Sequence, residues 1–355
     1  MLRPAPRRVA DAEGVRQDGA FEGSLEVVDW AEVRSGGPTR PVASALARAS
    51  RFLHHKRWWY AAVSTPEVLV STAIVNLGYV VNAFVFAADL PGRRLLFQRS
   101  FLGLPALSAT LTPRPGTGAL ATFRAPRARV ALSRGQDANA PYALRIRLPE
   151  LTLDAALEVS ATRPLTWIGP LGARVGTIEL ANCTQKIAGA PASGRLVVHG
   201  RDVPLDGALG GLDFTDGLLA RETAWRWAFA QGHADSGEVV GLNLVEGFNA
   251  RGASPETALG EDAVWLGGRP YPLGPARFDH DRDDPARPWH VSTACGAVDL
   301  RFTPGGRHAE GHDLGVARSR FLQVAGTWDG VITFDGVTRN LRGAAGVAED
   351  QAVRW

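Results

Sequence analysis

The strongest constraint on the fold is a pattern near the C-terminus. Short β-rich runs follow one another from Phe321 onward, and Asp329-Gly330 and Asp335-Gly336 separate them. Asp-Gly between such runs is a strong hairpin signal, because both central residues of the turn need a positive φ. Two such turns in series predict an antiparallel meander, and the sequence lacks the strand–helix alternation of a Rossmann-like fold.

The upstream sequence fits the same class. Most of the apolar runs between Trp58 and Val159 are five to eight residues long, which is typical of strands in a meander. The segment 217–231 has good helix formers, but Trp225, Trp227 and Phe229 alternate with smaller or polar residues, so a strand is predicted from about Thr223. A short helix is predicted over 45–54. The sequence therefore predicts an all-β protein.

The length bounds the number of domains. A chain of 355 residues exceeds the usual size of one hydrophobic core, so two fused antiparallel β-barrels are expected. Residues 1–45 are polar and mixed, and only 21–30 look able to pack, which predicts an arm over the main body. We expect the first barrel over 46–205 and the second over 206–355.

Charge and cysteine content argue against several classes of protein. The net charge is only +3, and the densest basic run, 51–60, resembles a solvated strand edge more than a nucleic-acid patch. Two cysteines fit a reducing cytoplasm. No apolar stretch follows the N-terminal arginines, so no secretory signal is predicted. Polar residues interrupt the apolar stretch 68–88, so no membrane span is expected. The oligomeric state is not predictable.

A set of motifs resembles one bacterial family. They are Lys56-Arg57-Trp58, Gln185-Lys186-Ile187-Ala188-Gly189, Gly211 to Gly217, Thr223 to Trp227, Val240 to Gly247, Glu261 to Trp265, and Gly346 to Asp350. Together they resemble domain of unknown function 2804, which is more distantly similar to carotenoid 1,2-hydratases and lipocalin-like pericyclases. The resemblance implies two fused lipocalin-like barrels and a pocket for a hydrophobic small molecule such as an isoprenoid or polyketide.

The resemblance to the hydratases is incomplete at their catalytic positions. Asp213 falls where the hydratase acid falls, but Gly211 replaces the tyrosine of the Tyr-x-Asp motif. Thr184 and Lys186 stand where the hydratases place a histidine and a tryptophan. Three of the four catalytic positions therefore depart from the pattern.

Asp213 and Lys186 are the candidate catalytic residues. A carboxyl group that faces an apolar interior is harder to ionise, so Asp213 is a candidate proton donor. It is equally suited to capping the turn that follows. A desolvated lysine opposite a carboxylate acts as a base, a Schiff-base former or an anion clamp, and Lys186 would otherwise lie at a solvated strand edge. Gln185 beside it is a candidate ligand contact.

Aromatic and polar residues supply the other candidates. On a strand, Trp225 and Trp227 share one face that could stack on a polyene or hold a cation, and Trp265 adds apolar area; core packing is the alternative. Glu246, Asn249 and Glu261 surround a glycine-rich bend and could orient a ligand, or serve only turn chemistry.

No cofactor is predicted. His308 and His312 lie in a glycine-rich stretch that favours a loop, and the spacing is not the helical zinc signature. Phosphate-binding loops and serine nucleophile elbows are also missing from the sequence.

Three hypotheses follow for function. The first is an acid-assisted hydratase, isomerase or cyclase that acts on a lipid-, isoprenoid- or polyketide-like molecule. The second is a non-catalytic carrier or sensor of a lipid-like ligand. The third is a carbohydrate-active protein that uses Glu246 and Glu261 as paired carboxylates.

Overall fold

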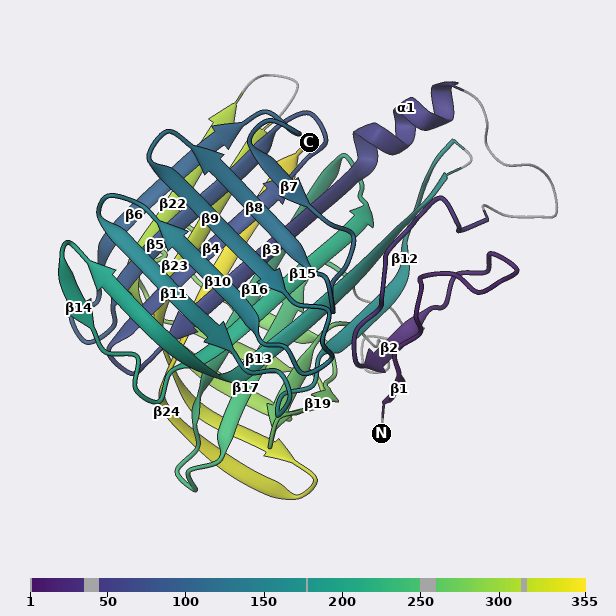
Figure 1. Cartoon of the computed structure of the whole chain (residues 1–355). Coiled ribbons are helices and arrows are strands. Elements are labelled where there is room, and N and C mark those ends of the chain that lie inside the picture. The colour runs from purple at the N-terminus through teal and green to yellow at the C-terminus, as the bar shows by residue number, and fades with distance from the viewer. Residues whose placement is uncertain (1, 35–44, 177, 250–259, 314–317) are drawn as a thin grey trace.

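The computed structural model describes residues 2–34, 45–176, 178–249, 260–313 and 318–355. Its strands form two large sheets, antiparallel except for the short parallel pair β1 (Arg3–Pro4) and β2 (Gly19–Glu22) (Figure 1). The α-helix within these ranges is α1 (Ala45–His54), where a helix was predicted. The all-β prediction is confirmed: the chain forms a nearly closed barrel sheet and a half-barrel sheet. No helix in the described ranges is long and apolar enough to cross a membrane.

The first sheet contains fifteen strands. Its main path runs β6-β5-β4-β3-β15-β13-β11-β10-β9-β8-β7, and it curls until β7 and β8 pack against β4. The strands are β1 (Arg3–Pro4), β2 (Gly19–Glu22), β3 (His55–Ser64), β4 (Val68–Asn76), β5 (Val81–Asp89), β6 (Arg94–Gly103), β7 (Ala109–Leu111), β8 (Leu120–Ala125), β9 (Ala128–Arg134), β10 (Tyr142–Arg147), β11 (Leu151–Leu157), β12 (Leu165–Val175), β13 (Ile178–Val198), β14 (Arg201–Val203) and β15 (Leu209–Leu218).

The long strand β13 joins the two halves of the first sheet. Its first half pairs with β12 and β15, and its second half pairs with β11 and β14. The ladder with β15 shifts register between Ile187 and Ala190, where Gly189 has a φ of 75°. A bulge of this kind bends a strand, so β13 can follow the curve of the barrel. The N-terminal arm adds its strand β2 to the outer edge of β12.

The second sheet contains nine strands in the order β19-β18-β17-β16-β24-β23-β22-β21-β20. The chain enters it between Leu218 and Glu222, after β15 has paired with β13 and β3 in the first sheet. The strands are β16 (Glu222–His233), β17 (Val239–Glu246), β18 (Ala263–Leu266), β19 (Arg269–Pro272), β20 (Ala276–Asp279), β21 (Trp289–Thr293), β22 (Val298–Asp313), β23 (Arg318–Phe334) and β24 (Val337–Arg354).

One of the two predicted hairpin turns is wrong. Asp335 and Gly336 both have positive φ, 53° and 73°, and they form the turn between β23 and β24 as expected. At the other site only Gly330 has a positive φ, and β23 continues through it with a bulge after Trp328. A two-residue hairpin turn of this type needs positive φ at both positions, so Asp329-Gly330 bends the strand without reversing it.

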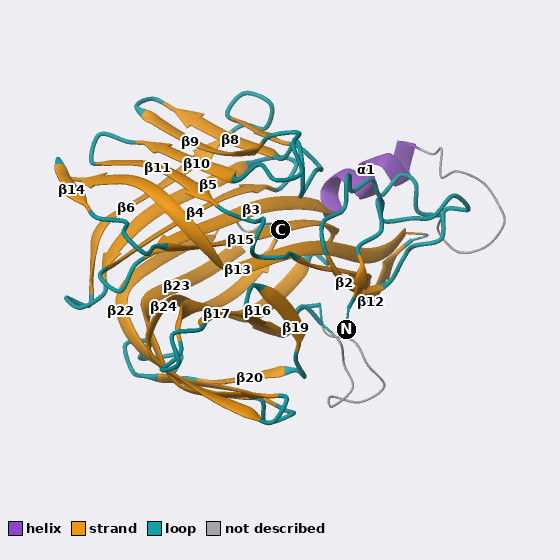
Figure 2. Ribbon diagram, turned by 60° about the horizontal axis from the view of Figure 1, so that its bottom comes forward, coloured by secondary structure: helices purple, strands orange, loops and turns teal. Residues whose placement is uncertain are grey.

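Apolar side chains form three buried cores. One core is enclosed by the curve of each sheet, and the third lies between the two sheets. Trp59, Ala61 and Val63 of β3 belong to the core of the first sheet. The alternating residues Tyr60 and Ala62 face the second sheet and pack with residues of β16, β17 and β24. Figure 2 shows the resulting stack, with β8–β11 above, β3 and β15 in the middle, and β16, β17 and β22–β24 below.

The two sheets approach most closely where β17 crosses β13. A Cβ added at Gly241 would lie 2.4 Å from the backbone carbonyl carbon of Ala188. No residue other than glycine fits at that distance without moving one of the sheets. The sheets also meet where Gly306 of β22 lies against Leu95 of β6, and the site described next occupies space between the two sheets.

Candidate functional site

A cavity of about 290 Å³ lies between the two sheets. It is lined mostly by apolar and aromatic side chains, with a few polar groups among them. The volume is near the lower end of the range for small-molecule sites. The cavity therefore lies outside the packed interior of either sheet, although the sequence pattern had suggested a pocket enclosed by a barrel.

Strand register places five of the lining residues in one row across the first sheet. Lys186 pairs with Asp213, Asp213 with Tyr60, Tyr60 with Ala73, and Ala73 with Phe84. Directly opposed residues in adjacent strands point to the same face, so this row faces the second sheet. The polar end of the row is at β13 and β15, and the apolar end is at β4 and β5.

A matching row crosses the second sheet. Val245 pairs with Trp227, Trp227 with Glu349, and Glu349 with Gln323. All four side chains line the cavity. Each row includes carboxylates and aromatic rings, so the two sheets present similar chemistry to the space between them.

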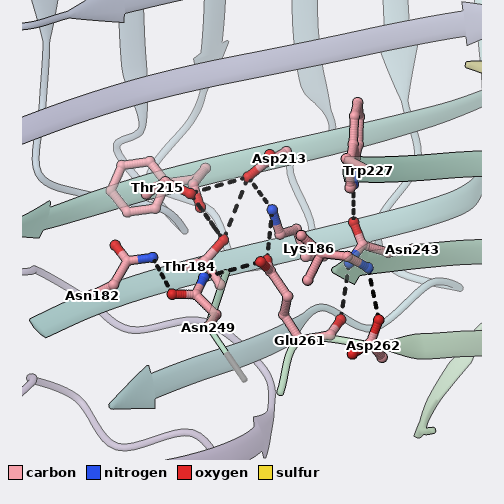
Figure 3. Close-up of polar contacts among 12 residues, drawn as sticks. Asn182, Thr184, Lys186, Asp213, Thr215, Trp227, Asn243, Asn249, Glu261 and Asp262 are labelled. Atoms are coloured by element: carbon pink, nitrogen blue, oxygen red, sulfur yellow. Dashed lines mark hydrogen bonds and ion pairs between the residues drawn. The ribbon is translucent and has the colours of Figure 1, made fainter. Parts of the chain in front are cut away.

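Lys186 lies between two carboxylates. Its Nζ is 2.7 Å from Oδ1 of Asp213 and 2.8 Å from Oε2 of Glu261 (Figure 3). All three side chains are buried. Burial lowers the pKa of Lys186, but the two carboxylates outweigh it and hold the pKa above its usual range, so the ammonium stays charged. A lysine held in this way does not serve as a nucleophile.

Hydrogen bonds fix both carboxylates. Oδ1 of Asp213 lies 3.4 Å from the hydroxyl group of Thr184 and 3.3 Å from that of Thr215. The nearest acceptor of Thr184 is the backbone carbonyl of Phe214 at 2.8 Å. Asn249 donates to Oε1 of Glu261 over 3.0 Å and accepts from Asn182. Burial raises the pKa of Glu261, and Lys186 partly offsets this effect.

The segment that carries Glu261 is tied to β17. Nδ2 of Asn243 donates to the backbone carbonyl of Glu261 over 2.9 Å, while Oδ1 of Asn243 accepts from Nε1 of Trp227 (Figure 3). The carboxylate of Asp262 accepts from the backbone N–H of Val245 over 2.7 Å. These bonds place Glu261 opposite Lys186, although Lys186 belongs to the other sheet.

Glu349 is the carboxyl group most suited to proton transfer. Nε1 of Trp225 donates to its Oε1 over 2.7 Å, and Nε2 of Gln323 donates to its Oε2 over 2.7 Å. Burial raises the pKa of Glu349 to about 7, against these two hydrogen bonds, and the charge of Asp213 adds to the rise. A carboxyl group with such a pKa is present in both protonation states at neutral pH.

Aromatic rings form the wall beside these acids. Trp58 and Trp225 stack with centroids 6.1 Å apart and planes 12° from parallel, and Phe248 contacts both rings. Nε1 of Trp58 donates to Oδ2 of Asp213 over 3.4 Å. The indole N–H groups therefore point at carboxylates, while the ring surfaces border the cavity.

A further carboxylate, Glu310, lines the cavity on β22. It accepts from Asn82 over 3.2 Å, from Ser100, and from Nε2 of His308 at 3.0 Å. Burial raises its pKa, but these hydrogen bonds and His308 outweigh burial and hold the pKa below its usual range. His308 and Glu310 lie in a strand and not in the loop that the glycines had suggested, because β22 and β23 pair along this stretch.

Five of the nine candidate site residues line the cavity. They are Lys186, Asp213, Trp225, Trp227 and Glu261. Asn249 supports Glu261 from behind. Arg226 points away from the cavity, as the alternation of β16 predicted, and pairs with Glu246.

The other three candidates lie elsewhere. Gln185 is on the opposite face of β13 and donates to Pro115 and Tyr142 inside the first sheet. Trp265 is packed between the sheets, and its Nε1 donates to the backbone carbonyl of Arg163. Glu246 is partly exposed and does not face Glu261 across the cavity, so these two carboxylates are not a pair on one substrate.

Sequence reasoning missed Glu349, Trp58 and Gln323. Glu349 and Trp58 fall within motifs that carry the family resemblance, but no local pattern gave either a role. Their position depends on pairing between strands more than a hundred residues apart in sequence, such as Trp227 with Glu349. No cluster of three or more potential metal ligands is found in the described part of the chain.

Comparisons with known proteins identify the family and the fold. The family described as domain of unknown function (DUF2804) matches residues 6–355, and the chain belongs to it. The solved structure of CghA is 11% identical and covers 93% of this chain and 97% of its own, with a TM-score of 0.50. Kievitone hydratase from Nectria haematococca is 10% identical, with coverages of 90% and 95% and a TM-score of 0.46. No curated protein matches the chain.

Proposed function

We propose that this DUF2804 protein binds a hydrophobic small molecule between its two sheets and acts on it by proton donation from Glu349. The reaction belongs to the hydratase, isomerase or cyclase class, in which a carbon or oxygen atom of the substrate gains a proton. The observation that carries the proposal is a carboxyl group with a pKa of about 7 in the wall of a mostly apolar cavity. General acid catalysis is most effective when the pKa of the acid is close to the working pH.

The neighbouring groups have distinct roles in this mechanism. Trp225 and Gln323 hold the carboxyl group of Glu349 in place, and their N–H groups stabilise the carboxylate that remains after the proton has left. Burial is the main cause of the raised pKa of Glu349, and the negative charge of Asp213 adds to the rise. Asp213 itself, the acid expected from its place in the sequence, is paired with Lys186 and lies beside the hydroxyl groups of two threonines. Its role is therefore to set the charge of the site.

The aromatic wall provides shape and excludes water. Trp58, Trp225 and Phe248 contact one another, and Tyr60 packs edge-on against Trp227 at 5.0 Å. Flat apolar surfaces of this kind suit an isoprenoid- or polyketide-like substrate. A dry cavity also strengthens the electrostatic effect of the fixed carboxylates on a reacting group.

The test is to search for a substrate with a variant that binds without turnover. Extracts of the host organism are incubated with wild-type protein and with Glu349→Gln, and small molecules are compared by mass spectrometry. We expect at least one hydrophobic compound to be consumed by the wild type and to remain bound to the variant in native mass spectra. A compound that both proteins bind and release unchanged would make the protein a carrier and refute the proposed chemistry.

The control changes a buried glutamine outside the cavity. Gln185→Glu changes a residue outside the cavity on the same strand as Lys186, so it tests whether any disturbance of this region stops turnover. We expect any folded Gln185→Glu protein to keep turning over the compound that Glu349→Gln retains. Equal loss in both variants would count against Glu349 as the donor.

A further inference from the structure

The buried end of the cavity contains more acids than bases. Asp213, Glu261 and Glu349 line it with side chains that are at least 89% buried, while Lys186 is the one cation among the described lining residues of this end. This end therefore holds three carboxyl groups against one lysine. Lys186 is also within 2.8 Å of two of these carboxylates, so no positive charge is left over for an anionic ligand.

The other cations of the lining are at the exposed end. The side chains of Arg318 and Arg354 are 64% and 44% exposed, and Leu102, which also lines the cavity, is 61% exposed, so these residues mark the opening. Arg318 pairs with Asp313 at 3.1 Å, and Arg354 lies 3.6 Å from Glu222. Arg318 and Arg354 are therefore each paired with a carboxylate outside the buried end. The electrostatic potential along the cavity favours positive charge at the buried end.

The aromatic rings strengthen this preference. The faces of indole and phenyl rings are negative, so they attract a cation placed over them. Nε1 of Trp58 points at Asp213 and Nε1 of Trp225 at Glu349, so the positive edges of these rings are bound by carboxylates. Phe248 completes a group of three rings in mutual contact. Rings and carboxylates together are the usual means of recognising substituted ammonium ions.

We infer that the buried end of this cavity is a site for an organic cation, and that the ligand is an amphiphile with a substituted ammonium group, not a fatty acid. Its apolar part would extend from the ring group of Trp58, Trp225 and Phe248 toward Val75 and Phe84. This cation site rests on the proposed function, since both use the same cavity, but it is tested by binding alone.

The test uses three probes with one alkyl chain and different head groups. Decyltrimethylammonium, decanol and decanoate are titrated at pH 8 against protein loaded with the neutral dye N-phenyl-1-naphthylamine, and displacement is followed by dye fluorescence. We expect the ammonium compound to bind at least tenfold more tightly than decanol, and decanoate to bind at least tenfold more weakly. Equal affinities for the three probes, tighter binding of decanoate, or no displacement by the ammonium compound would overturn the inference.

Two variants locate the effect at the buried end. Trp225→Leu removes a ring that donates to Glu349, whereas Trp355→Leu removes a tryptophan that lines the cavity but whose indole N–H has no hydrogen-bond partner among the residues that the structure describes. We expect Trp225→Leu to abolish the preference for the ammonium compound over decanol. We expect Trp355→Leu to lower the affinity for all three probes by the same factor, so that the ratios of their affinities stay unchanged. Glu349→Gln, which preserves size, should reduce the preference several-fold even if Trp225→Leu fails to fold. An unchanged preference in Glu349→Gln would refute the site.

The result also separates this inference from the proposed function. If decanol displaces the dye but head-group charge has no effect, the cavity remains a ligand site for neutral molecules and only the cation site fails. If the ammonium compound is preferred while no extract compound is turned over, the cation site stands and the proposed chemistry fails.

Discussion

Two buried acidic clusters lie on opposite faces of β15, only three positions apart in the sequence. On one face, Asp216 accepts from Nε1 of Trp30 at 3.0 Å, Nε2 of His55 at 2.7 Å and Nε of Arg57 at 2.5 Å. On the other face, Asp213 belongs to the group of Lys186, Asp213, Glu261 and Glu349 that lines the cavity. We call the first group the arm clamp and the second the acid cluster.

The two clusters differ in charge balance. In the arm clamp, burial raises the pKa of Asp216, but His55 and Arg57 outweigh burial and hold the pKa below its usual range. In the acid cluster, one lysine serves several carboxylates, and burial raises the pKa of Glu349 to about 7. A buried acid with enough cationic partners holds the structure together, as Asp216 does when it binds Trp30 of the N-terminal arm. An acid in excess is available for chemistry.

The sharpest test of this difference is the rate of turnover. Glu349→Gln should lower the turnover of the compound found in the extract screen by about 10²- to 10⁴-fold, which is the usual contribution of general acid catalysis. The measurement is the single-turnover rate under saturating substrate. Asp216→Asn, corrected for its folded fraction, should keep a rate close to that of the wild type. Similar losses in both variants would remove the distinction between the two clusters.

The reverse pattern is expected for stability. Asp216→Asn leaves Arg57 without its buried carboxylate and should reduce the free energy of unfolding by about 3 to 5 kcal/mol. Urea denaturation at pH 7 measures the change. The control is Asp202→Asn, because Asp202 pairs with Arg195 on the surface at 2.7 Å, where solvent screens the pair, and its loss should change the free energy of unfolding far less. A change in Asp216→Asn no larger than in the control would contradict the structural role of the arm clamp.

The clusters should also respond to pH in opposite directions. The pKa of Glu349 in the folded protein, about 7, exceeds its ordinary value of 4.5, so the folded state binds its proton more tightly. Stability from this group is therefore present below about pH 4.5 and is lost as the pH rises through 7, by about 3 kcal/mol in total. The lowered pKa of Asp216 acts in the opposite sense, because its contribution is present at neutral pH and is lost on acidification.

Unfolding measured between pH 5 and 8 separates these two effects. The difference in stability between wild type and Glu349→Gln should shift in favour of the variant as the pH rises. A constant difference over this range would show that Glu349 is ionised throughout.

The smallest effect on stability is expected at the contact between Gly241 of β17 and Ala188 of β13, which sets the distance between the two sheets. Gly241→Ala would press a Cβ atom against the backbone of Ala188, and we expect a loss of about 1 to 3 kcal/mol in unfolding free energy. Probe affinity should also change, since the same displacement alters the width of the cavity. Gly207→Ala is a control without contacts, although its φ of 66° adds local strain. A milder effect at Gly241 than at Gly207 would mean that the sheets separate without cost.

The sequence predicted the fold class better than the location of the cavity. Alternation in β16 and the turn at Asp335-Gly336 are local signals, and both predictions are confirmed. The cavity between the sheets depends on β3 and β4 having both faces covered. Their nearly continuous apolar sequence, unlike the alternation of a strand with one solvated face, is the signal that could have indicated this.

The site was predictable only in part, because some of its residues are brought together by strands that are distant in the sequence. Asp213 and Lys186 are directly paired across β15 and β13, and both had been singled out from the sequence. Glu349 lies in the other sheet, and its raised pKa depends on burial and on the charge of Asp213 across the cavity. Such an effect arises from the packing of distant strands and leaves no trace in the spacing of residues along the chain.

The protonation state of Glu349 tests the account most directly. Infrared difference spectra of wild type minus Glu349→Gln, recorded between pH 5 and 9, isolate the carboxyl stretch of this single residue. The account predicts a protonated carboxyl band at pH 5 that disappears with a midpoint near pH 7. A spectrum with only the carboxylate band from pH 5 upward would contradict it.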